Sequence, residues 1–109
     1  MRNRDILGRW EEAYLLSIWE LGEKAYGVTI KRVVSEKTGR ELSYGGLYFT
    51  LAQLVKKGLA EKSAGEPSPK RGGRRKFYYS LTRKGKAALR EAFDFQKALW
   101  RDVGKPAFD

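Results

Sequence analysis

The residues with the clearest chemical potential are lysines and arginines gathered in the second half of the chain. Between Pro67 and Arg90 there are nine basic residues and no acidic one, so this segment carries a charge of +9. Ammonium and guanidinium groups at this density bind phosphates, and each contact releases counterions. The segment predicts a surface that meets a polyanion. The nine residues are Lys70, Arg71, Arg74, Arg75, Lys76, Arg83, Lys84, Lys86 and Arg90.

The residue types needed for most enzyme chemistry are missing. The chain has no Cys and no His, which removes the thiolate nucleophile, the imidazole base and the common zinc ligand sets. Glu11 and Glu12 are adjacent in sequence and would diverge on a helix. We therefore expect neither an enzyme nor a bound metal or cofactor.

Length and charge narrow the class of partner. A chain of 109 residues is the size of one domain, which we place over residues 1–109. Its formal net charge of +10 favours nucleic acid or an anionic membrane surface as partner. No stretch approaches the roughly 20 apolar residues of a spanning helix. We therefore expect a cytoplasmic protein without membrane association and with a nucleic acid as its partner; the element order described below specifies double-stranded DNA.

The pattern of apolar residues predicts the elements that position these charges. Apolar residues recur at helical spacing in the first half, and the period then changes to that of two short strands joined by a Gly- and Pro-rich loop. Ser43 and Thr82 are suited to cap the third and last helices, and Gly39 to end the second. We expect helices over 7–21, 28–37, 44–57 and 82–101, and strands over 59–63 and 77–81.

This order predicts a mainly α fold with a small β-hairpin. Three helices followed by a hairpin make a winged helix-turn-helix, here over residues 7–81. The helix over 82–101 is an addition at the C-terminal side, and residues 102–109 form a tail.

The first and last helices carry more apolar surface than one small domain can cover. Leu15, Leu16 and Trp19 lie off the main stripe of the first helix, so this helix is either the centre of the core or also faces another subunit. The last helix has a broad apolar face, which favours a role in dimerisation; the alternative is packing on the first helix. The main stripes are Leu7, Trp10, Tyr14, Ile18 and Leu21, and Leu89, Phe93, Gln96 and Trp100.

The third helix is the candidate reader of DNA bases, because a helix fits the major groove. Tyr44 and Tyr48 have two interpretations, since each lies beside the core stripe and its ring could pack under the helix. The expected DNA contacts from this helix are Ser43, Tyr44, Gly46, Tyr48, Phe49, Thr50 and Gln53. Those from the loop of the hairpin are Lys70, Arg71, Arg74, Arg75 and Lys76.

Four segments, in this order, together resemble the PadR family of transcriptional regulators. They are AYGVTI at 25–30, LSYGGLYFTL at 42–51, KGL at 57–59 and GRRKFYYSLTRKG at 73–85. The chain departs from the family pattern at two places. The usual Gly-Thr before Leu-Tyr is Gly45-Gly46, and Phe49 stands where Pro is common.

The resemblance implies a dimeric repressor whose third helix is the recognition helix. It also implies a small apolar or aromatic effector, held at the dimer interface between rings of the C-terminal helices, whose binding weakens the grip on DNA. The residues expected at the dimer interface and ligand site are Trp10, Phe93, Gln96 and Trp100. The alternative function is a winged-helix protein-interaction module without a specific DNA target.

Overall fold

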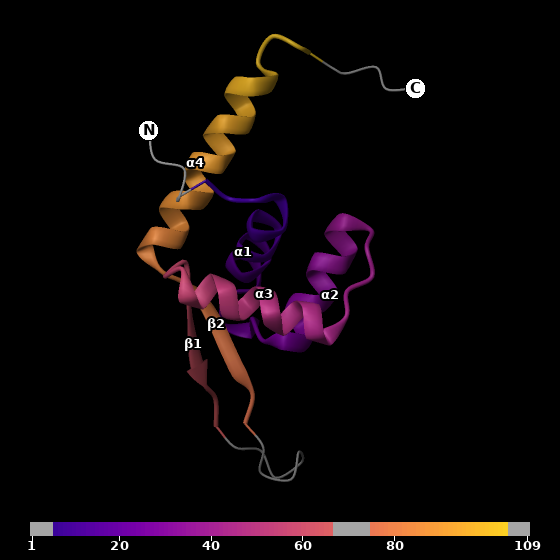
Figure 1. Ribbon diagram of the computed structural model, residues 1–109, viewed down its shortest axis with the longest axis vertical. Helices are drawn as coiled ribbons and strands as arrows, with labels where there is room; N and C mark the ends of the chain where they lie inside the picture. The colour runs from indigo at the N-terminus through magenta and orange to yellow at the C-terminus, as the bar shows by residue number, and fades with distance from the viewer. Residues whose placement is uncertain (1–5, 67–74, 105–109) are drawn as a thin grey trace.

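The structure, a computed structural model, describes residues 6–66 and 75–104. Within these residues, three α-helices pack around a core, a two-stranded hairpin projects from it, and a fourth α-helix extends in another direction (Figure 1). None of the described helices has the length and apolar character to span a membrane. The elements are α1 (Arg9–Leu21), η1 (Gly22–Lys24), α2 (Gly27–Thr38), α3 (Tyr44–Lys56), β1 (Ala60–Ala64), β2 (Phe77–Leu81) and α4 (Arg83–Trp100).

The predicted fold class is confirmed, and the element boundaries shift by no more than two residues. The first helix starts at Arg9 rather than at residue 7, and the first strand covers 60–64 rather than 59–63. The expected caps are present. The hydroxyls of Ser43 and Thr82 accept hydrogen bonds from the backbone N–H groups of Gly46 and Gly85, each at 3.0 Å.

The core lies where α1, α2 and α3 meet the root of the hairpin. Leu47, Leu51 and Leu54 of α3 are fully buried, as the apolar spacing predicts. Leu15 is also fully buried, although the expected stripe of α1 leaves it out. Leu16 and Trp19 remain exposed. Helix α1 is therefore the centre of the core and still presents an uncovered apolar face.

The hairpin is antiparallel and is tied to the start of α2. Ala60 pairs with Leu81 at its root and Ala64 with Phe77 at its outer end. The backbone N–H of Tyr79 donates to the carbonyl of Ala25 at 2.9 Å. This bond fixes the direction in which the hairpin leaves the helices.

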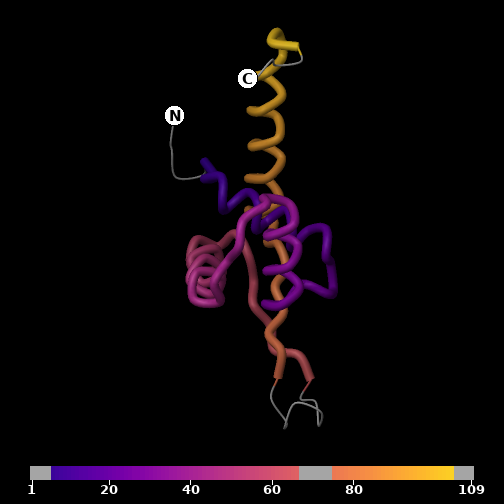
Figure 2. Tube along the Cα trace, turned by 90° about the vertical axis from the view of Figure 1, so that its right-hand side faces the viewer, coloured from indigo at the N-terminus to yellow at the C-terminus, as the bar shows by residue number. Residues whose placement is uncertain are grey.

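Helix α4 extends away from the rest of the molecule. Figure 2 shows α4 running past the other helices while the hairpin points the opposite way. Of its 18 residues only Gly85 and Ala88 are buried. The longest dimension of the molecule is 55 Å.

The start of α4 is locked to the turn between α3 and β1. A Cβ placed on Gly85 would lie 2.0 Å from the carbonyl oxygen of Leu59, so only hydrogen fits there. The Thr82 N–H donates to that same carbonyl at 3.1 Å, and the Lys84 ammonium donates to the Lys57 carbonyl at 3.0 Å. This junction holds α4 at one angle to the helices before it.

We predict that Gly85→Ala lowers the free energy of unfolding by about 1–3 kcal/mol, because the methyl group overlaps a backbone atom. In an open helix the same change stabilises by up to about 1 kcal/mol. Gly45→Ala is the matched control, since a Cβ there meets no atom within 4 Å. Urea unfolding of both variants tests this, and equal stability of the two would contradict it.

Candidate nucleic-acid interface

The outer face of α3 is presented to solvent by burial of the opposite face. Because Leu47, Leu51 and Leu54 point into the core, the residues half a turn away point outward. Phe49 is 66% exposed, the largest exposed fraction among the large apolar side chains described. The exposed residues of this face are Gly45, Phe49, Ala52 and Lys56, spaced by four, three and four positions.

Tyr44 and Tyr48 flank this face and combine both expected interpretations. Each ring is about half exposed, and the two are stacked with centroids 6.3 Å apart. The Tyr48 hydroxyl also lies against the first residue of α2, since a Cβ on Gly27 would come within 2.2 Å of it. Tyr48 thus packs against α2 through its hydroxyl end while part of its ring remains accessible.

Aromatic rings hold lysine side chains along the hairpin. The Lys76 ammonium lies 4.0 Å from the ring centroid of Tyr26, and the Lys62 ammonium lies 4.5 Å from that of Phe77. The Tyr26 ring in turn packs against Tyr78 at 5.5 Å. Such contacts restrict flexible ammonium groups without neutralising them.

A groove of about 370 Å³ connects α3, the start of α2 and the hairpin. Its lining includes three cationic side chains and no carboxylate, so the lining carries a formal charge of +3, which favours an anionic partner. Burial raises the pKa of the Tyr79 phenol at its floor, and the neighbouring Tyr48 phenol adds to this rise. The lining residues are Tyr26, Gly27, Val28, Tyr48, Lys62, Arg75, Lys76, Phe77 and Tyr79.

The structure brings together only part of the predicted DNA-contact set. Tyr48, Arg75 and Lys76 meet at the groove described above. Ser43 and Gly46 are exposed at the start of α3, and Gln53 is half-buried on its side. Three predicted contacts in the loop of the hairpin, Lys70, Arg71 and Arg74, lie outside the described residues.

Thr50, one of the expected DNA contacts, has a partner inside the protein. It is half-buried, and its side chain is hydrogen-bonded to Tyr14 of α1. Burial raises the pKa of the Tyr14 phenol, and this hydrogen bond partly offsets the rise. Thr50 supplies a polar partner for a buried phenol, so it supports α3 from beneath.

Two residues that line the groove, Lys62 and Tyr26, are not among the contacts expected from the sequence. Lys62 lies on an exposed position of β1, directly opposite Tyr79 in the register. The signal that could have identified Lys62 is its position in a short, mostly polar strand that leads into a basic loop. The role of Tyr26 depends on its packing against Tyr78, which no local pattern reveals.

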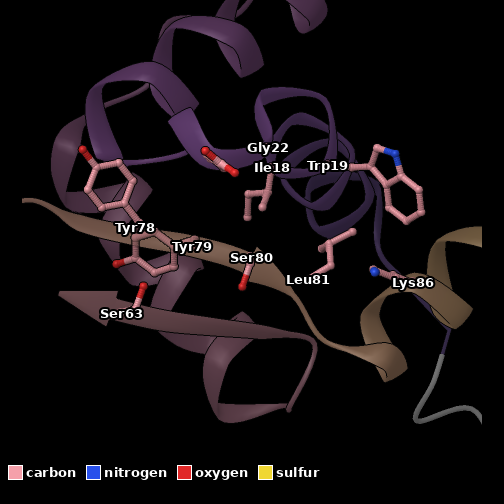
Figure 3. A pocket seen from close by; sticks show the side chains of 10 residues that line it. Ile18, Trp19, Gly22, Ser63, Tyr78, Tyr79, Ser80, Leu81 and Lys86 are labelled. Carbon is pink, nitrogen blue, oxygen red and sulfur yellow. The ribbon is translucent and has the colours of Figure 1, made fainter. Parts of the chain in front are cut away.

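A second groove lies between α1, β2 and the start of α4. Its volume is about 520 Å³, and Figure 3 shows Trp19 and Lys86 at one end with Tyr78 and Ser63 at the other. The Lys86 ammonium lies 5.7 Å from the Trp19 ring centroid. Trp19 also lines an adjoining groove of about 660 Å³ along α4, together with Leu16 and Phe93.

The residues predicted for a dimer interface and ligand site are spread along α1 and α4. Phe93 lines the 660 Å³ groove, whereas Gln96 lines a separate groove of about 230 Å³. The Trp100 indole N–H donates to the Gln96 side-chain oxygen at 3.2 Å. Trp10 and Trp100 are 42% and 43% exposed. Phe93 and Gln96 therefore line two different grooves of the protomer.

Comparison with known proteins identifies the class to which this fold and surface belong. The model of the transcriptional regulator PadR-like family matches residues 15–91. The chain therefore belongs to this family of DNA-binding transcription regulators, which are not enzymes. A comparison with curated proteins found no match.

Several solved structures are similar to this chain over most of its length. RosR from H. salinarum is 30% identical with a TM-score of 0.72, over 96% of this chain and 84% of that one. A PadR-like transcription factor from Bacteroides fragilis is 27% identical with a TM-score of 0.68, over 86% and 85%. A PadR-like regulator from Bacillus cereus, 24% identical with a TM-score of 0.70 over 86% of each chain, shares the fold.

We predict that replacing Arg75 and Lys76 together with Ala weakens binding to all duplexes by a similar factor. Each lost phosphate contact lowers the slope of log K against log salt by about 0.9, so the slope should fall by about 1.8. Fluorescence anisotropy over a salt series measures this. Lys37→Ala is the control, because that lysine pairs with Glu20 at the far end of α2. An unchanged slope in the double variant would contradict the assignment of the groove.

Proposed function

We propose that the protein is a sequence-specific repressor that binds double-stranded DNA as a homodimer. Residues 7–81 of each protomer bind one half-site, and the helix over 82–101 joins the two protomers. The observation that carries this proposal is the presence of two separate unpartnered surfaces on one small chain. One is α3 with its cationic groove, and the other is the apolar face of α4.

The first surface is suited to a DNA duplex. Helix α3 exposes one face along its whole length, which a major groove about 12 Å wide can accept. The cations Lys62, Arg75 and Lys76 lie beside it, where the phosphates flanking that groove would pass. In the sequence, residues 67–76 carry five basic residues and no acidic one.

The second surface is suited to a second copy of the chain. Helix α4 is about 27 Å long, and its C-terminal part extends beyond the other helices (Figure 1). Phe93, Phe95 and Leu99 are 57%, 63% and 60% exposed. Large exposed apolar side chains gathered on one helix favour an interaction site in a soluble protein. Two α4 helices packed together would cover it.

The same interface would hold an effector. Phe93, Trp100 and the uncovered α1 residues Trp10 and Trp19 supply flat apolar rings, and Gln96 orients the Trp100 indole. A small apolar or aromatic molecule inserted between the protomers would change the angle between the two α4 helices. Because α4 is locked to the α3–β1 turn through Gly85, that change would alter the spacing of the two α3 helices. The altered spacing would weaken the binding of the dimer to DNA.

We predict that Phe93→Glu disrupts the dimer and, with it, specific DNA binding. A charge placed in an apolar interface has no partner and is costly to bury. Sedimentation velocity should show a dimer for the wild type and a monomer for the variant. The operator is first selected from a randomised duplex library, and should show twofold symmetry with half-sites about 34–36 Å apart.

The second measurement compares the affinity of the wild type and of Phe93→Glu for the operator and for a scrambled duplex. The wild type should prefer it to a scrambled duplex by about a thousandfold or more, and Phe93→Glu should lose most of this preference. Phe49→Glu, the same change on α3, is the control: it should stay dimeric and still lose DNA binding. A wild-type monomer, or equal affinity for both duplexes, would contradict the proposal.

A further inference from the structure

We propose that the recognition helix reads its operator chiefly through thymine methyl groups, with Phe49 as the principal reader. This inference rests on the proposed function, since it assumes that α3 enters the major groove of a specific site. Beyond the proposed function, the inference names the chemical group of the operator that the helix recognises.

The outer face of α3 has little capacity for hydrogen bonding to bases. Gly45, Phe49 and Ala52, three of its four exposed residues, carry no side-chain donor or acceptor. The fourth, Lys56, is the last residue of the helix. Gln53 is half-buried beside this face. Tyr44 and Tyr48 also carry hydroxyls, but they flank this face, and the Tyr48 hydroxyl lies against Gly27. The N-terminal half of the outer face itself, which comes closest to base edges in this class of motif, is therefore apolar.

The major groove has one apolar feature that such a face can recognise. Each base pair presents donors and acceptors there, and only thymine adds a methyl group at C5. Phe49 exposes 66% of its surface, and among the described residues it stacks on no other ring, whereas Tyr44 and Tyr48 stack on each other. Contact with a methyl group would remove apolar surface of both partners from water.

The glycines before Phe49 permit the close approach that this contact requires. A Cβ added to Gly45 would meet no protein atom within 4 Å, so the space above it is open to a partner. Without a side chain at Gly45, the first turn of α3 can enter the groove deeply. The Phe49 ring, one turn further on, then reaches the level of the base edges.

The surroundings of this face favour DNA over an apolar protein partner. The adjoining groove carries Lys62, Arg75 and Lys76 without any carboxylate. A protein partner would have to supply a matching acidic rim, whereas every DNA duplex has phosphates on both sides of its major groove.

Replacing thymine by deoxyuridine in the selected operator tests the proposal. This change removes the C5 methyl and leaves the hydrogen-bonding edge intact. We expect wild-type affinity to fall by about fourfold for each contacted methyl, and thus by about 15-fold when one is contacted in each half-site. With Phe49→Ala, affinity for the thymine operator should fall, and the further loss on deoxyuridine substitution should nearly disappear.

Arg75→Ala is the matched control, because it removes a charge and leaves α3 intact. It should bind both operators more weakly and keep the wild-type ratio between them. Equal wild-type affinity for the thymine and deoxyuridine operators would overturn the inference and leave the proposed function standing. A deoxyuridine penalty of full size in Phe49→Ala would overturn the role of Phe49. If the library yields no enriched sequence, both the inference and sequence-specific repression fail.

Discussion

The close approach of Gly85 to the Leu59 carbonyl is the constraint on which the relation between the two surfaces depends. There is room for a hydrogen atom and not for a methyl group, and Thr82 donates its N–H to the same carbonyl. Backbone therefore packs directly on backbone where α4 begins. On our account, a helix anchored in this way moves as one body with the turn after α3, and a displacement of α4 would therefore reach the face of α3 that we propose to meet DNA.

On the proposed DNA-facing side, affinity and specificity would come from two kinds of residue. Cations at the groove attract phosphates whatever the sequence, and their energy depends strongly on salt. The outer face of α3 contributes little charge, since Lys56 is the only lysine, arginine or acidic residue among its exposed residues. On our account, discrimination between sequences comes from an apolar helix face, and the surrounding charge supplies the strength and the speed of encounter.

Much of the fold could be predicted from the sequence because its signals are local. Ser43 and Thr82 cap helices as their types and positions indicate, and the apolar spacing of Leu47, Leu51 and Leu54 gives the buried side of α3 correctly. What escaped prediction depends on distant partners. Thr50 turns inward because Tyr14, 36 positions earlier, needs a hydrogen-bond partner. From the sequence alone, Gly85 is only a glycine that lowers the stability of its helix. Its packing role becomes visible only when the position of the Leu59 carbonyl is known.

The most direct test of the account is to map which backbone amides of the protein respond to the operator, by NMR titration of the 15N-labelled dimer. We predict that the largest shift changes fall on Gly45, Phe49 and Ala52 of α3 and on Lys62, Arg75 and Lys76 around the groove. The amides of α4 beyond Ala92 should change least. A response concentrated on α4, with α3 unaffected, would show that DNA is held elsewhere and would contradict the central claim.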